Sequence, residues 1–238
     1  MRHFYETRTA FVHDVLAQVA APGGRAILDA GFIGSYAEAT VHYAIVDMLR
    51  DGDRLTGIDI DAPRLEAFLA HPKTQQRQER FDLRYERRSV FDTGYESGAF
   101  DAVLLLEVFE HLHAPYRVFD EVARLLKPGG SFILTYPNPL SLTKLLRYLW
   151  QGDLLDHGYL RAYRGAPDHK VFPHPPSLAN YLIDVGLQPR SVVFIKYAYR
   201  QLGALNRLLP RWNVTRKLAA YVGVHATRRG PERAGDDA

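Results

Sequence analysis

Three side chains within five residues have the types and spacing to do chemistry. Glu107, Glu110 and His111 are related as i, i+3 and i+4, and residues with this spacing project to one side of a helical turn. Their carboxylate and imidazole groups can take a proton from a reacting hydroxyl, and together they suit a divalent ion such as Mg²⁺ or Mn²⁺. Glu110 and His111 can equally cap and solvate the start of a helix without any ion. The pattern leaves both interpretations open.

Four further polar side chains are candidate bases. His157, His169 and His174 fall in a later polar and aromatic stretch, and Tyr136 ends a predicted strand. Histidine changes charge near neutral pH, which suits it to proton transfer, but a histidine in a proline-bounded loop is more often a hydrogen-bonded packing residue. We therefore take His111, His169 and Tyr136 as the catalytic candidates.

Two turns combine glycine with aspartate, and both follow short apolar runs. In the first, Asp29 is followed by Gly31 and Gly34; in the second, about 30 residues later, Asp59 follows Gly57. Glycines permit a tight turn and a close approach of the backbone to a ligand, and a carboxylate at the second turn is suited to accept both hydroxyls of a ribose. Each turn alone is also typical of an ordinary turn or a helix cap. Their combination is more specific than either.

Alternating strands and helices must position these residues. Apolar periodicity and turn residues predict helices at 4–20, 36–50, 62–70, 115–126 and 176–185, and strands at 26–28, 54–59, 83–90, 101–106, 131–136, 188–196 and 219–227. Such alternation implies parallel pairing with right-handed crossovers. The predicted fold is α/β, a Rossmann-like, doubly wound and mostly parallel seven-stranded sheet with helices on both faces. In such sheets ligands bind beyond the carboxyl ends of the strands.

Length and composition predict one domain. The 238 residues are 47% hydrophobic and 24% charged, which suffices for one substantial core. We expect a single domain over 1–228, with a lid or acceptor-binding insertion at 140–175 and a disordered tail at 229–238. There is no cysteine, which excludes disulfides, thiolate metal sites and cysteine nucleophiles.

Charge and hydropathy favour a cytoplasmic protein. The N-terminus lacks the uninterrupted apolar run of a signal peptide, and no stretch reaches the roughly 18 apolar residues of a membrane span. The net charge of +3 gathers toward the C-terminus, where 198–217 could form a basic helix resting on a membrane, although Pro210 would break it. Without a recognisable RNA-binding module, a nucleic-acid partner is not expected. The oligomeric state is left open.

In order and spacing, a set of motifs over residues 25–137 resembles the class I S-adenosylmethionine-dependent methyltransferases, and the likeness continues loosely to 227. The motifs are Asp29-x-Gly31-x-x-Gly34, Gly57-x-Asp59, Gly98 to Val103, Glu107 to Leu112 and Leu126 to Gly130. The resemblance implies S-adenosylmethionine as the cofactor and methyl transfer as the reaction. A dinucleotide oxidoreductase is disfavoured because its Gly-x-Gly-x-x-Gly pattern is absent.

The resemblance also assigns residues to parts of the cofactor. Gly31 and Gly34 would approach the methionine portion, Asp59 would hold the ribose, and Ser89 with Val90 would flank adenine. The full set of expected cofactor-binding residues is Asp29, Gly31, Gly34, Asp59, Ile60, Ser89, Val90, Asp92 and Glu107. Two departures from the family pattern stand out: the first turn lacks the usual Gly-x-Gly-x-Gly, and Ser89 stands where many members carry aspartate.

A metal site is a second implication of the resemblance. The string Glu107-x-x-Glu110-His111 is similar to one in small-RNA 2′-O-methyltransferases and ubiquinone-type O-methyltransferases, where it holds a metal that positions the acceptor. Asp168-His169-Lys170 resembles the segment that supplies a further histidine in the RNA enzymes. The candidate metal ligands are therefore Glu107, Glu110, His111 and His169.

The acceptor is the least defined part of the prediction. The stretch 137–150, which begins Pro-Asn-Pro-Leu-Ser, resembles methyltransferases of polysaccharide and lipid-linked glycan assembly, so a sugar hydroxyl leads. A small aromatic or quinone-like hydroxyl competes with it, and RNA is third. The altered glycine turn also leaves open a methyltransferase-like protein that binds a cofactor or partner without turnover.

Overall fold

The computed structural model describes residues 4–33, 40–151, 171, 173–195 and 217–230. Its first half contains β1 (Phe4–Tyr5), α1 (Arg8–Leu16), β2 (Ala26–Ala30), α2 (Thr40–Val46), β3 (Arg54–Asp59), α3 (Ala62–Ala70), α4 (Pro72–Arg80) and β4 (Asp82–Arg87). Its second half contains β5 (Phe100–Leu106), the 3₁₀ turns η1 (Phe109–His111) and η2 (Pro115–Arg117), α5 (Val118–Leu125), β6 (Leu126–Pro137), α6 (Leu142–Gln151), α8 (Pro175–Asp184), β7 (Leu187–Ile195) and β8 (Tyr221–Arg228).

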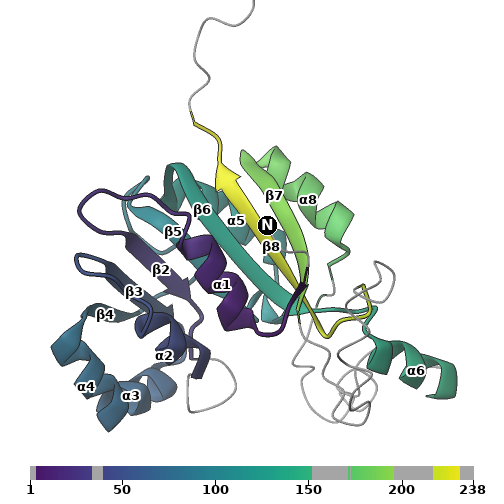
Figure 1. The fold of residues 1–238 in the computed structure, drawn as a ribbon, viewed down its shortest axis with the longest axis horizontal. Helices are drawn as coiled ribbons and strands as arrows, with labels where there is room; N and C mark the ends of the chain where they lie inside the picture. The colour runs from purple at the N-terminus through teal and green to yellow at the C-terminus, as the bar shows by residue number, and fades with distance from the viewer. Residues whose placement is uncertain (1–3, 34–39, 152–170, 172, 196–216, 231–238) are drawn as a thin grey trace, which may run out of the picture.

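The strands form one mostly parallel sheet, which confirms the predicted fold class. Their order is β1-β7-β8-β6-β5-β2-β3-β4. Only β8 runs antiparallel to its neighbours, β6 and β7, among the described strands. The order of strands switches at β2, with β3 and β4 added on one side and β5 and β6 on the other. Because these strands are parallel, the carboxyl ends of β2 to β6 lie along one edge of the sheet (Figure 1).

The sheet has eight described strands rather than the predicted seven. The extra strand is β1, whose Phe4 and Tyr5 pair in parallel with Phe194 and Ile195 of β7. The prediction that a helix begins at residue 4 was therefore wrong; α1 begins at Arg8, after Thr7 caps it by accepting a hydrogen bond from the Ala10 backbone N–H. Two residues are too few for an alternating pattern, so helical spacing masked the strand.

Helices cover both faces of the sheet, as predicted. On one face, α1 and α2 pack over a core that includes Phe11, Val15 and Ile133. On the other, α5 and α8 cover a core that includes Phe119 and Leu182, and Figure 1 shows these two helices behind the sheet while α1 crosses its front.

Helix α4 was not predicted, because its sequence is almost entirely polar. Its Thr74 is the one buried residue among the nine, so no apolar stripe marks it. Among the described residues, no helix has the length and apolar character needed to cross a membrane.

Candidate active site

The first glycine turn packs directly against the end of β5. Gly31 follows β2 with a φ of 72°, in the left-handed region that favours glycine. Its backbone N–H donates to the Ile58 carbonyl over 2.7 Å. A Cβ at position 31 would lie 2.6 Å from Cγ2 of Val108, so a larger residue would separate the two turns. Gly34, the second glycine of the motif, lies outside the described residues.

Asp29 is buried beneath this turn. Its Oδ2 lies 2.7 Å from Nδ1 of His42, whose Nε2 lies 3.0 Å from the Tyr85 hydroxyl. The Phe32 ring packs on His42 with 4.5 Å between ring centroids. The carboxylate thus joins β2 to α2 and β4, an arrangement that favours support of the turn over direct contact with a cofactor.

Asp59 is partly exposed at the end of β3. Its Oδ2 accepts from the Ile33 N–H over 3.3 Å, and its Oδ1 accepts from the Asp61 N–H over 3.0 Å. Each carboxylate oxygen can accept more than one hydrogen bond, so capacity remains for a ligand's hydroxyls. The next side chain, Ile60, is 66% exposed and offers an apolar surface beside the carboxylate.

The expected adenine-side residues lie next to Asp59. The N–H of Arg88 donates to the Asp59 carbonyl over 3.1 Å. Ser89 and Val90 are half-buried, and Asp92 is exposed. The Ser89 hydroxyl accepts from the Phe91 N–H over 3.2 Å, so it shapes its own turn. The structure therefore brings the ribose and adenine candidates together.

Glu107 and Glu110 follow β5 at the same edge. Glu107 has a φ of 59°, and its N–H donates to the Thr135 carbonyl of β6 over 3.0 Å. Its Oε2 lies 3.6 Å from Nη1 of Arg8. The Glu110 side chain is 1% exposed, and its Oε1 lies 4.0 Å from Nε2 of His111, which is 30% exposed.

The two carboxyls sit in an environment that disfavours two negative charges. Burial raises the pKa of Glu110, and the neighbouring charge of Glu107 raises it further. Burial also raises the pKa of Glu107, while the cations of Arg8 and Lys144 oppose the shift. Oε1 of Glu107 and Oε2 of Glu110 are buried with no hydrogen-bond partner among the described residues. At neutral pH this environment favours a protonated Glu110, while Glu107, whose pKa is raised to about 7, can still change charge.

The described residues give no support for a metal site. Within that part of the chain, no three or more histidine, aspartate or glutamate side chains form a group that could hold an ion. Arg8 and Lys144 already supply positive charge to Glu107 and Glu110. His169, the fourth expected ligand, lies outside the described residues, so the metal site stays a prediction.

Tyr136 is unsuited to the expected role of base. Its side chain is fully buried in β6, and its hydroxyl has no hydrogen-bond partner among the described residues. Burial raises the pKa of Tyr136, so the phenol stays protonated at neutral pH. It can donate a hydrogen bond but not take a proton.

Sequence reasoning missed three side chains that shape the site. Arg8 comes from α1, His42 from α2 and Lys144 from α6. None belongs to a sequence motif, because each interacts with a residue that is close in space but distant in the sequence. Of the weaker histidine candidates, His174 is the N-terminal flanking residue of α8, whereas His157 lies outside the described residues.

Comparison with known proteins gives one family model and several relatives. The model described as "Methyltransferase domain" matches residues 37–134. The chain is 30% identical over 186 residues to the ubiquinone biosynthesis O-methyltransferase of Xanthomonas campestris pv. campestris, covering 77% of this chain and 70% of that protein. It is 29% identical over 178 residues to the enzyme of the same name from Psychrobacter arcticus, where it covers 73% of this chain and 63% of that protein. The chain thus spans less than two thirds of the length of the Psychrobacter relative.

Solved structures share the fold. A putative methyltransferase from Bacillus halodurans superposes with a TM-score of 0.61 at 13% identity, covering 93% of this chain and 99% of that one. The geranyl diphosphate C-methyltransferase of Streptomyces coelicolor, solved with Mg²⁺ and S-adenosyl-L-homocysteine, superposes with a TM-score of 0.62 at 17% identity, covering 93% and 75%.

Proposed function

This chain belongs to the class I S-adenosylmethionine-dependent methyltransferases, and from that membership we propose that it transfers a methyl group to a hydroxyl of a small molecule. The observation that carries the proposal is the contact between Gly31 and Val108. This contact places the turn after β2, expected to bind the cofactor, directly against the turn after β5 that contains Glu107 and Glu110. Donor and acceptor would therefore meet beside Glu107, whose carboxyl can accept a proton near neutral pH.

The residues at the sheet edge fit S-adenosylmethionine. Asp59 keeps acceptor capacity for the ribose hydroxyls, and the exposed Ile60 offers an apolar face to adenine. Because this cofactor has no pyrophosphate, the first turn needs no helix N-terminus to cradle one, and Ile33 can stand where the family has glycine. When bound, the cofactor supplies a methyl group on a sulfonium sulfur.

The chain's own contribution is alignment and proton removal. Methyl transfer is an in-line displacement, and correct alignment of the reactants can supply most of its rate. As the oxygen–carbon bond forms and the sulfur–carbon bond breaks, the acceptor hydroxyl must lose its proton. Glu107, whose pKa burial raises to about 7, or the partly exposed His111 can take it.

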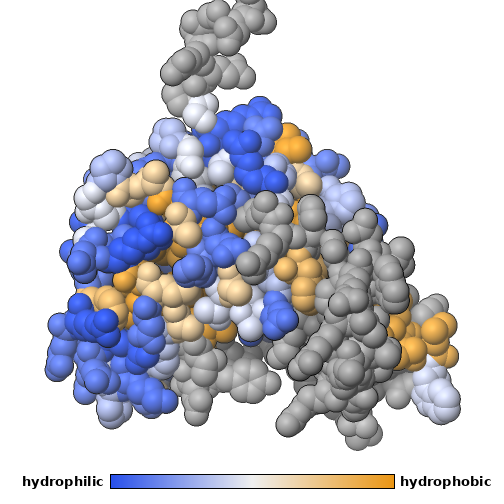
Figure 2. Space-filling view, viewed as in Figure 1, coloured by the Kyte–Doolittle hydropathy of each residue, from blue (hydrophilic) through white to orange (hydrophobic). Residues whose placement is uncertain are grey.

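An aromatic hydroxyl is the acceptor class that we propose first. The relatives are named for ubiquinone biosynthesis, and hydrophobic side chains gather on α6, the helix that follows β6 (Figure 2). Leu146, Leu149 and Trp150 of α6 are exposed, which suits an apolar acceptor. A sugar hydroxyl is the second candidate, favoured by the stretch that begins at Pro137. Incubation with radiolabelled cofactor and matched panels of catechols and glycosides, each with and without chelator, would decide both acceptor class and metal dependence.

Calorimetry with S-adenosylmethionine tests the core of the proposal. We expect Asp59→Ala to weaken binding at least about tenfold, because it removes the acceptors of the ribose hydroxyls. Asp61→Ala is the matched control, since Asp61 is two residues away and its carboxylate contacts Arg64, accepting from the Arg64 N–H to cap α3 and pairing with its guanidinium over 3.3 Å. Failure of the wild-type chain to bind, or equal affinity in Asp59→Ala and Asp61→Ala, would contradict the proposal.

A further inference from the structure

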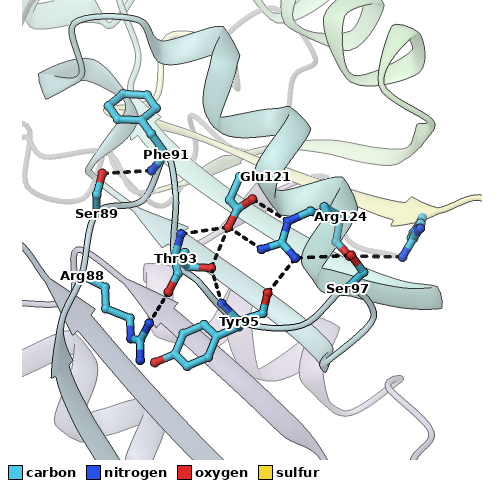
Figure 3. A network of polar contacts seen from close by, with 9 residues as sticks. Arg88, Ser89, Phe91, Thr93, Tyr95, Ser97, Glu121 and Arg124 are labelled. Carbon is cyan, nitrogen blue, oxygen red and sulfur yellow. Dashed lines mark hydrogen bonds and ion pairs between the residues drawn. The ribbon is translucent and has the colours of Figure 1, made fainter.

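The loop that follows β4 is fastened to α5 by a polar network. Figure 3 shows the residues of this loop reaching toward Glu121 and Arg124 of α5. The loop leaves the sheet beside Asp59, through the hydrogen bond from the Arg88 N–H to the Asp59 carbonyl. It then carries Ser89 and Val90 past the expected adenine position before it turns toward α5. The contacts that hold this loop therefore affect the shape of the proposed cofactor site.

Glu121 is the centre of the network. Its Oε1 accepts from the Thr93 N–H over 2.9 Å and from the Thr93 hydroxyl over 2.6 Å. Arg124 donates from Nε to Oε2 over 2.8 Å and from Nη2 to Oε1 over 2.7 Å. The carboxylate is buried, and the hydrogen bonds from Arg124 are the main reason why its pKa is lowered to about 2. The Glu121 carboxylate therefore stays ionised at neutral pH, and both of its oxygens accept hydrogen bonds.

Two arginines add further hydrogen bonds to the loop. Nη1 of Arg124 donates to the Tyr95 carbonyl over 2.6 Å and to the Ser97 hydroxyl over 3.3 Å. From the other side, Nη1 of Arg88 donates to the Thr93 carbonyl over 2.5 Å, and its guanidinium lies 4.4 Å from the centre of the Tyr95 ring. Thr93 is therefore fixed at its N–H, its hydroxyl and its carbonyl.

The stability of α5 does not require this arrangement. The helix already packs an apolar face onto the sheet through Val118, Phe119, Val122 and Leu125. Burying a carboxylate is costly unless several hydrogen bonds compensate it. Here Arg124 of α5 donates two of them, and Thr93 of the loop donates the other two. What the network fixes is the loop backbone, within three residues of Val90.

We propose that Glu121, acting through Thr93, is a positioning residue for the adenine side of the cofactor site. It holds the loop so that Ser89 and Val90 stand at a fixed distance from Asp59 and Ile60, which defines the slot for the base. This inference rests on the proposed function. It assigns a role in binding to side chains that need not touch the cofactor.

The test compares ligands that differ only in the base. Calorimetry with S-adenosylhomocysteine and S-inosylhomocysteine gives two dissociation constants, and their ratio measures discrimination of the base. We expect Thr93→Val and Glu121→Gln to weaken S-adenosylhomocysteine binding about tenfold and to bring the ratio toward one. Thr93→Ser keeps the hydroxyl and should restore both values.

Lys127→Met is the matched structural control. Lys127 makes a two-bond ion pair with Asp101, over 2.9 and 2.8 Å, at the opposite edge of the sheet. The Lys127→Met variant should have a lower melting temperature than the wild type but the same two dissociation constants. If Thr93→Val and Glu121→Gln lower the melting temperature but leave affinity and ratio unchanged, the inference is wrong while the proposed function stands. If the wild-type chain binds neither ligand, the proposed function fails and the inference with it.

Discussion

At the scale of single residues, Glu107 shows how backbone strain and chemistry coincide. It is the one non-glycine residue with a positive φ among those described, and such a conformation costs about 1 to 3 kcal/mol. The strain turns the chain at the end of β5, so that the carboxylate points back toward Arg8 and Glu110. A residue chosen for stability alone would be glycine, as at Gly31.

We predict that Glu107→Gly is more stable than Glu107→Ala by about 1 kcal/mol. Both variants lose the carboxylate, so the difference between their free energies of unfolding measures the cost of the positive φ at position 107. In an ordinary helix or strand the order is reversed, with alanine favoured by roughly 0.5 to 1 kcal/mol. Urea unfolding at pH 7 measures the difference.

The outcome against this prediction would be an alanine variant at least as stable as the glycine variant. That result would mean that the chain relaxes at position 107 without the side chain. Gly98→Ala is a useful comparison, because Gly98 also has a positive φ, of 70°, and no atom lies within 4 Å of its missing Cβ. It should show the same backbone cost without any effect of the site.

The residue types at the site were predictable, but their contacts were not. Asp59 and the Glu107 to His111 string carry local motifs, and the sequence places both after strands. The pairing of Asp29 with His42 depends on a helix 13 residues later, and Arg8 and Glu107 are 99 residues apart in the sequence. Tyr136 was taken for a base because sequence shows its type but not its burial.

At the scale of elements, His42 joins three parts of the fold. It reaches from α2 to Asp29 at the end of β2 and to Tyr85 of β4. Phe32, Phe68 and Tyr85 surround its ring. The bridge holds the first glycine turn from below, so the turn's position depends on α2 and β4 as well as on its own glycines.

We predict that His42→Phe lowers the free energy of unfolding by about 3 kcal/mol, because it leaves a buried carboxylate without its partner. Asp29→Ala/His42→Phe should cost less than the sum of the single variants by about 1 to 3 kcal/mol, since the two residues interact directly. Denaturant unfolding of the four proteins gives this coupling energy.

A more exposed pair supplies the control for His42. Arg77 of α4 and Asp47, which follows α2, form a bidentate ion pair over 2.9 and 2.6 Å, and their side chains are 21% and 50% exposed. Because such pairs are screened by solvent, Arg77→Met should cost less than about 1 kcal/mol. A loss in Arg77→Met as large as that in His42→Phe would overturn the argument from burial.

Long periodic elements were predictable and short or polar ones were not. The strands at 54–59 and 101–106 and the helix at 62–70 match β3, β5 and α3 closely, because each buries an apolar run. Neither β1 nor α4 has such a run. β1 exists because β7 offers it an edge, and sequence alone does not show which edge a two-residue segment will find.

At the scale of the whole molecule, residues far apart in the chain gather around Glu107. The family model covers residues 37–134, yet Arg8 lies before it and Lys144 and Tyr221 lie after it. The Arg8 guanidinium stands 5.0 Å from the centre of the Tyr221 ring and 3.6 Å from Glu107. The matched region supplies Glu107 and Glu110. Charged groups beside them, and Gly31 of the first turn, lie outside it, so the motifs of that region alone do not define the acceptor.

Buried titratable groups also tie the stability of the whole molecule to pH. Burial, followed by the nearby charge of Arg190, lowers the pKa of His225 from 6.5 to about 4. Hydrogen bonds from Arg124 lead the causes that lower the pKa of Glu121 from 4.5 to about 2. In each case the unfolded chain binds the proton first, so stability falls as pH falls. The Glu107–Glu110 pair acts oppositely, because raised pKa values favour the folded state as pH falls toward 4.5.

Difference curves separate these contributions. We predict that wild-type stability relative to His225→Gln falls by about 2 to 3 kcal/mol between pH 6.5 and 4, and that relative to Glu121→Gln it falls by on the order of 2 kcal/mol as pH drops from 4.5 toward 2. The Glu107–Glu110 contribution cancels in both differences, since every variant retains the pair. Urea unfolding at pH 7, 5.5, 4.5, 3.5 and about 2.5 samples both windows. A His225→Gln curve parallel to wild type from pH 7 to 4.5 would show that His225 takes up its proton at the same pH in the folded and unfolded chains, and its burial would then have no part in acid sensitivity.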